Sequence, residues 1–334
     1  MKRRNFLKIA AALPAAAELT APAAAQSADF EKPFGELAHQ TADAAAPLVW
    51  YTRRMTPEGI NALITALITE GGWKPGAKTA IKMTFESSSG PRLDTRYVKA
   101  AADRVKATLI DNNGYSSERG ETQAHLALAK RHGYADLAPV DILDAAGDMD
   151  LPVNNGYRLK YTRTGRHFAQ YDSILSMVRF KAHYLPRYGG TLKNLSICMG
   201  SLSGKALIHS GGDVDTHYTS SDARTTGEAM ADAVKAAMDA KPGRWAFIQV
   251  LDAVEPQDQC EGTRNLGDIG IFASRDPVAL DQAAIDLTFR AAANTAQRRA
   301  WDEYHSTFLP ELAEKIGVGK THYRLKSVDG GDGK

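Results

Sequence analysis

Cysteine is scarce in this sequence, with Cys198 and Cys260 the only two among 334 residues. A conventional iron–sulfur cluster takes about four cysteine thiolates, so one chain does not supply such a cluster by itself. In an oxidising compartment the two residues could form a disulfide, or they could be separate buried thiols. The sequence leaves both alternatives open, and both cysteines are candidate metal ligands.

The motifs of several function classes are also absent. The sequence has no basic run, no alternation of basic and aromatic residues and a formal net charge of only +2, which argues against a nucleic-acid partner. No apolar run after residue 25 is long enough to span a bilayer. The G-x-S-x-G, H-E-x-x-H, C-x-x-C and Walker spacings are missing as well. Serine hydrolases, zincins, thioredoxins and P-loop proteins are therefore not indicated.

The sequence does contain an export pattern at its start. Arg3-Arg4 is followed by Phe-Leu-Lys, by an Ala-rich apolar stretch over residues 9–17 and by the small residues Ala23-Ala24-Ala25. A basic start, a short apolar stretch and small residues at a cleavage site are typical of secretory signals, and the paired arginine indicates the twin-arginine pathway. We expect residues 1–25 to be a twin-arginine signal peptide and residues 26–46 a flexible leader. The mature protein is then periplasmic or otherwise extracytoplasmic.

Strand and helix patterns alternate over residues 47–334. Short apolar strands are predicted at 48–52, 79–84, 107–111, 140–143, 158–162, 173–178, 245–251 and 269–273. Helices are predicted from 56 to 70, 94 to 105, 118 to 132, 225 to 240 and 276 to 290, with a last helix that includes Trp301. Alternating strands and helices predict an α/β fold, a mostly parallel sheet with helices on both faces. We expect a single compact domain.

The segment after the predicted strand 173–178 is the richest in reactive side chains. Ligands of open α/β sheets bind beyond the carboxyl ends of strands, lysines attract phosphate or carboxylate groups, and imidazoles bind metals or move protons. The alternative interpretation is a solvated basic loop with turn glycines. The candidate residues of this segment are Lys181, His183, Lys193, Asn194, Lys205 and His209.

Two other polar segments are predicted near strand ends. Asp111 ends the predicted strand 107–111 and Asn113 lies just after it, where a type I turn is the alternative interpretation. Asp281 lies one turn into the helix that begins at Asp276, itself a predicted N-cap. If these segments converge at one end of the sheet, Asp281 would position a base, the lysines would bind an anion, and His183 or His209 would transfer protons or hold metal.

These segments carry a family resemblance. The stretch F-K-A-H at residues 180–183, G-G-T-L-K-N at 189–194, G-K at 204–205 and His209 resembles the most distinctive motif of the domain-of-unknown-function 362 family. Residues 268–281, which read D-I-G-I, then A-S-R-D-P-V-A-L-D, are similar to another family motif. Many relatives carry a ferredoxin-like insert of clustered cysteines after the His. Residues 211–226 contain no cysteine, so that insert is absent here.

The resemblance and the residues lead to two functional hypotheses. The first is a redox-associated or metal-assisted enzyme that acts on a small anionic substrate. The second is a non-catalytic protein that holds a metal centre or an anionic ligand for a redox partner protein. The candidate metal ligands in both are His183, His209, Cys198 and Cys260.

Overall fold

The computed structural model describes residues 34, 37–88, 90–183, 187–252, 267–291 and 308–330. The elements described below all belong to one compact unit, Gly35–Lys334. The predicted signal peptide, Cys260 and the predicted helix around Trp301 lie outside the described residues. Within the described ranges, no helix has both the length and the apolar character required to cross a membrane.

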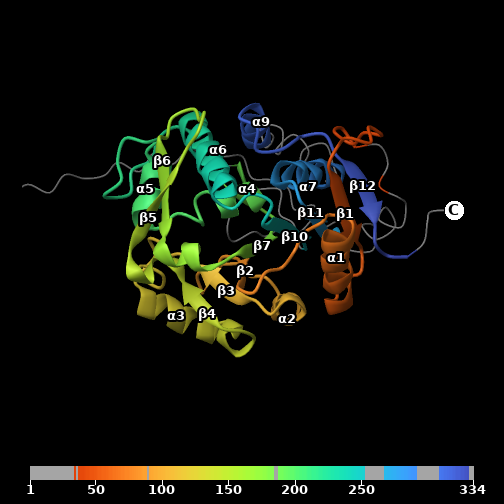
Figure 1. Ribbon diagram of the computed structural model, residues 1–334, viewed down its shortest axis with the longest axis horizontal. Helices are drawn as coiled ribbons and strands as arrows, with labels where there is room; N and C mark the ends of the chain where they lie inside the picture. Colours follow the sequence, from red (N-terminus) through yellow and green to blue (C-terminus); the bar gives the residue numbers. More distant parts are fainter. Residues whose placement is uncertain are drawn as a thin grey trace, which may run out of the picture. The chain divides into compact units, whose positions relative to one another are not determined.

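An eight-stranded sheet forms the centre of this unit, in the order β12-β1-β11-β10-β7-β2-β3-β4 (Figure 1). Its strands are β1 (Leu48–Thr52), β2 (Thr79–Lys82), β3 (Thr108–Asp111), β4 (Val140–Ile142), β7 (Ser173–Arg179), β10 (Trp245–Leu251), β11 (Gly270–Ser274) and β12 (Arg324–Ser327). β11 runs antiparallel to both of its neighbours, and the other neighbouring strands pair in parallel. The predicted mostly parallel α/β sheet is confirmed.

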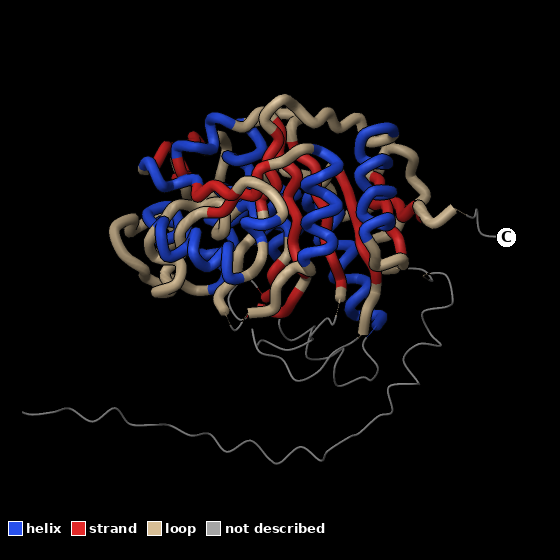
Figure 2. The backbone as a smooth tube through the Cα atoms, turned by 90° about the horizontal axis from the view of Figure 1, so that it is seen from below, coloured by secondary structure: helices blue, strands red, loops and turns tan. Residues whose placement is uncertain are grey.

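Helices cover both faces of the sheet, as Figures 1 and 2 show. The helices are α1 (Pro57–Thr69), α2 (Thr95–Val105), α3 (Thr122–Arg131), α4 (Thr191–Leu195), α5 (Leu202–His209), α6 (Ala223–Ala240), α7 (Pro277–Ala291) and α9 (Phe308–Lys315). α1 and α2 lie on one face, whereas α4, α6 and α7 lie on the other. Because both faces are covered, β10 is buried along its whole length and reads as a nearly continuous apolar run.

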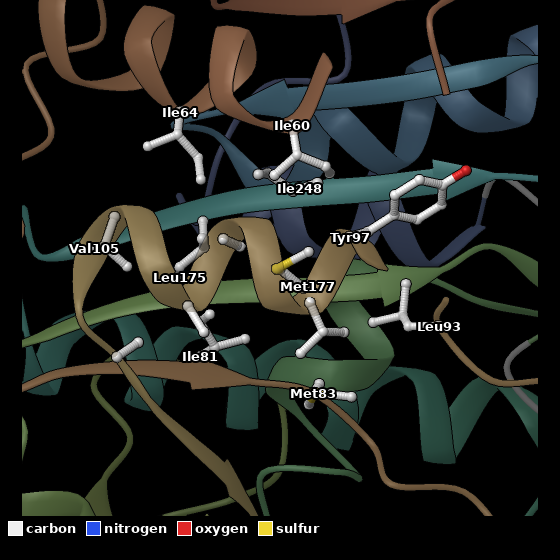
Figure 3. Packing of buried hydrophobic residues seen from close by; sticks show 14 of the residues in the cluster. Ile60, Ile64, Ile81, Met83, Leu93, Tyr97, Val105, Leu175, Met177 and Ile248 are labelled. Atoms are coloured by element: carbon white, nitrogen blue, oxygen red, sulfur yellow. The ribbon is translucent and has the colours of Figure 1, made fainter. Parts of the chain in front are cut away.

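The first face shows how the sequence pattern produces the core. Thr56 caps α1 by accepting a hydrogen bond from the Gly59 N–H at 3.3 Å. Ile60 and Ile64, one turn apart, are fully buried and pack toward Leu175 and Ile248 of the sheet (Figure 3). Burying each such side chain contributes about 1.5–3 kcal/mol.

Two predicted segments differ from their expected form. The predicted strand 158–162 is β6 (Tyr161–Gly165), which pairs with β5 (Asp148–Pro152) in a separate hairpin and not with the main sheet. The Gly-rich segment after β7 is not a solvated loop. It forms the hairpin β8 (Lys181–His183) and β9 (Arg187–Gly189), followed by α4 and α5. Apolar residues anchor both short helices, among them Leu192 and Ile208, which are fully buried.

Candidate functional site

A pocket lies where the direction of the chain switches across the sheet. β2 and β7 are neighbours, but β2 leads on to β3 on one side and β7 leads on to β10 on the other. Loops that diverge in this way open a crevice beyond the carboxyl ends of the strands. Here the crevice is a small pocket with a cavity volume of about 40 Å³. It is lined by Thr84, Glu86, Pro91, Leu93, Met177, Val178, Arg179, Lys181, Gly189, Gly190, Lys193, Asn194 and Cys198.

A buried ion pair forms the base of this site. The Lys82 Nζ donates to Asp111 Oδ1 at 3.1 Å, to Asn194 Oδ1 at 3.0 Å and to the Met83 carbonyl at 2.9 Å. Lys82 and Asp111 are both 0% exposed. Burial alone would raise the pKa of Asp111, but the charges of Lys82 and Arg119 hold that pKa well below its usual range. Asp111 is therefore ionised, and its role is structural, at the ends of the strands.

Asn194 joins α4 to this ion pair. Its Nδ2 donates to Ser176 Oγ at 2.8 Å and to the Lys82 carbonyl at 3.1 Å. The side chain is thus held on both sides by β2 and β7 while it lines the pocket. Two predicted anion ligands lie on α4, and of these Lys193 is the one that brings a charge to the pocket lining.

Asp281 lies behind α4 and not on the pocket lining. Its Oδ1 accepts from the Thr191 N–H at 2.7 Å and its Oδ2 accepts from the Leu192 N–H at 2.9 Å. The side chain is fully buried, and this burial raises its pKa to about 6 despite the hydrogen bonds that the carboxylate accepts. Asp281 can therefore reach a ligand only through the position of α4.

Glu86 is a pocket residue that the sequence analysis missed. Its carboxylate is 2.9 Å from Lys181 Nζ. Burial would raise the pKa of Glu86, but Lys181, Arg119 and Lys193 together lower it. The residue follows Phe85 just beyond β2, so the strand-end rule that selected Asp111 would also have found it.

Other predicted residues lie beside the pocket. The buried Lys205 ammonium donates to the Gly200 carbonyl, and burial lowers its pKa to about 8. The ring of His209 packs against Tyr218 with centroids 4.9 Å apart. Burial, with Lys193 and Lys205 nearby, lowers the pKa of His209 to about 4, so its ring is neutral at pH 7.

Asn113 holds the turn after β3. Its N–H donates to Asp144 Oδ1 at 2.9 Å and its Nδ2 donates to Thr122 Oγ1 at 3.2 Å. These bonds link the end of β3 to the start of α3. Asn113 is not among the lining residues of the pocket.

The candidate metal ligands are only partly described. Cys198 is a partly buried residue that lines the pocket. The side chain of His183 and all of Cys260 lie outside the described residues, so their ligand roles and the pairing of the cysteines stay predictions. Among the side chains that the structure describes, no three His, Cys, Asp or Glu residues are grouped so that they could hold a metal ion.

Fold and site together define an α/β protein with a positively charged pocket at the switch point of its sheet. Residues 79–286 match the model of the family described as domain of unknown function (DUF362). The chain belongs to this family, and the matched range runs from β2 into α7 and includes every described residue of the pocket lining.

Comparisons with individual proteins give shorter or more distant matches. The arsenate respiratory reductase molybdopterin-containing subunit ArrA of Chrysiogenes arsenatis is 28% identical over 154 residues, which are 43% of this chain and 17% of that protein. The chain therefore matches less than a fifth of that subunit's length.

Two solved structures are also similar. The lactate racemase apoprotein of Thermoanaerobacterium thermosaccharolyticum superimposes with a TM-score of 0.40 at 12% identity, over 62% of this chain and 51% of that one. A protein from Thermotoga maritima superimposes with a TM-score of 0.37 at 10% identity, over 79% of this chain and 60% of that one.

Proposed function

We propose that this protein binds a small anionic ligand in the switch-point pocket. The observation that carries the proposal is the charge of the lining. Arg179, Lys181 and Lys193 line the pocket together with one carboxylate, that of Glu86. A second carboxylate, that of Asp252, lies 2.6 Å from the Arg179 guanidinium, so the site has a net charge of +1. A partly enclosed pocket strengthens the attraction between such charges and an anion, because less water screens them.

We propose further that the protein is an enzyme acting on this anion. The pocket places two groups capable of chemistry beside the cations, the Glu86 carboxylate and the Cys198 thiol. A carboxylate can exchange protons with a bound ligand, and a cysteine side chain can act as a nucleophile. A metal-assisted version of this enzyme would draw ligands from His183 or Cys260. Metal analysis and a visible spectrum of protein purified without oxygen test that version.

A binding protein without turnover is the second candidate. It is favoured by the place of His209, whose ring packs against Tyr218 and is not part of the lining, so that this imidazole does not face a bound anion for proton transfer. Both candidates use the same anion site.

The anion site is tested by calorimetric titration with acetate and with inorganic phosphate. Replacing Lys193 with Met should weaken binding of at least one of these anions about tenfold or more, because a charge-assisted hydrogen bond contributes about 1.5–3 kcal/mol. Lys99→Met is the matched control, since Lys99 is an exposed residue of α2 paired with Asp103. Equal affinities in the two variants and the wild type would refute the site.

We also propose that the protein is exported by the twin-arginine pathway. Arg3-Arg4 precedes a short apolar stretch. Replacing both arginines with lysine should leave the precursor in the cytoplasm, as measured by cell fractionation. Unchanged export of the double variant would contradict the proposal.

A further inference from the structure

The backbone of Glu86 has an uncommon conformation. Its φ is 55°, in the left-handed region that disfavours residues with a side chain. Backbone strain of this kind persists only where the surrounding structure enforces it, and it is concentrated at functional sites. Glu86 lines the pocket, and 23% of its side chain is exposed.

The preceding residue, Phe85, is held on both sides. Its N–H donates to Asp111 Oδ2 at 3.1 Å, and its carbonyl accepts from His132 Nδ1 at 2.8 Å. Phe85 is itself fully buried. These contacts hold the chain in place immediately before Glu86, which explains how the left-handed conformation is maintained. They also direct the carboxylate toward Lys181.

A carboxylate at this place works against the binding of a simple anion. An incoming negative group is attracted by Lys193 and Lys181 but repelled by Glu86, which lines the same pocket. The charge of Arg179 is balanced by Asp252, 2.6 Å away. A glutamine or a serine here would leave the pocket more positive and would avoid that repulsion. The carboxylate becomes favourable when the ligand also brings a hydrogen-bond donor, because an ionised carboxylate is a strong acceptor.

We propose that Glu86 selects the ligand: the pocket takes an anion that carries a hydroxyl or ammonium donor next to its negative group. The inference rests on the proposed anion site and adds the class of ligand. The lysines bind the negative group and Glu86 accepts from the donor. A site built to bond a donor discriminates against the analogue without it. That analogue offers the Glu86 carboxylate no donor beyond Lys181 and still brings a negative group next to it.

The test compares two probes that differ by one hydroxyl group, glycolate and acetate. Wild-type protein should bind glycolate at least about tenfold more tightly than acetate, by calorimetry at pH 7. The Glu86→Gln variant lacks the negative charge, so it should bind acetate more tightly than the wild-type protein does. The ratio of the two affinities should then fall toward one.

A second variant separates the carboxylate from the backbone strain. Glu86→Gly removes the side chain and suits the positive φ, so the fold should be retained or stabilised while the preference for glycolate is lost. Equal binding of the two probes by the wild type, with both affinities still dependent on Lys193, overturns the role of Glu86 and leaves the anion site standing. A preference that persists in Glu86→Gln also overturns it. If neither probe nor phosphate binds the wild type, the anion site itself is refuted, and the selection with it.

Discussion

Replacing Asp281 with Asn probes how the pocket is held in place. Asp281 on α7 accepts two backbone N–H groups from the first turn of α4, the helix that carries Lys193. Asparagine has nearly the same shape but only one acceptor oxygen. The exchange therefore removes the negative charge and one of the two hydrogen bonds, and leaves one buried N–H of α4 unpaired.

Two terms of opposite sign set the size of the effect. An unpaired buried N–H costs about 1–3 kcal/mol at every pH. The charge term depends on pH, because burial raises the pKa of Asp281 from 3.8 to about 6. Between pH 4 and pH 6 the folded protein keeps a proton that the unfolded chain releases, so wild-type stability falls as the pH rises through this window. The fall amounts to about 3 kcal/mol for this single group.

Asparagine does not titrate, so the stability of Asp281→Asn does not fall in this way as the pH rises. We expect the variant to be about 1–3 kcal/mol less stable than the wild type at pH 4. At pH 7 it should be equal to the wild type or up to about 2 kcal/mol more stable, because only the wild type loses about 3 kcal/mol between these pH values. Urea unfolding of both proteins at pH 4, 5, 6 and 7 measures the difference. The reasoning would be refuted by a difference in the free energy of unfolding that is constant over this range. It would also be refuted if the variant became less stable relative to the wild type as the pH rises.

Asp276→Asn is the matched control for the link to the pocket. Asp276 also has a pKa raised by burial to about 6, and it accepts the N–H groups of Val278, Ala279 and Lys320. It has no hydrogen bond to α4 among those described. For both variants the difference in stability from the wild type should change with pH, but only Asp281→Asn should weaken anion binding.

Two other predictions concern stability. Lys82→Met should cost about 3–5 kcal/mol in urea unfolding, because it leaves the fully buried Asp111 without its nearest counter-charge; a cost below 1 kcal/mol would show that the pair is dispensable. Gly165→Ala should lower the melting temperature sharply, because its new Cβ would lie 2.0 Å from the Leu143 carbonyl carbon and 2.1 Å from the Asp144 nitrogen, both backbone atoms. The control is Gly120→Ala, whose Cβ would be 3.2 Å from its nearest neighbour, the Ser116 carbonyl oxygen. Similar melting temperatures for the two variants would contradict the steric argument.

Much of the fold could be predicted from local patterns. The strands at 48–52, 107–111 and 245–251 and the helices after Thr56 and Asp94 depend on apolar spacing and on caps, which neighbouring residues encode. β12 and the hairpin of β5 and β6 were not predicted as such. Their pairing depends on partners that are distant in the sequence or on a weak polar pattern. The short helices α4 and α5 were also missed, because glycines in that segment favour turns.

The candidate site was predicted in part. The rule that polar groups after strands gather at one edge located Asp111, Lys181 and Lys193. This rule does not distinguish the side chains that line the pocket from those that are bonded inside the fold. Asp111 is occupied by the ion pair with Lys82, and Asp281 is occupied by the backbone of α4.

The sequence by itself determined the alternation of strands and helices, the family and the positions of the polar residues along the chain. These properties are local, because they depend on side-chain spacing and on residue type. Only the tertiary structure decided which polar groups are used up inside the fold and which line the pocket. That division depends on the order of strands β10, β7 and β2 and on the packing of α4 against α7. Both are set by contacts between residues about 70 or more positions apart, such as Trp245 with Ile174 and Thr191 with Asp281, which no local pattern encodes.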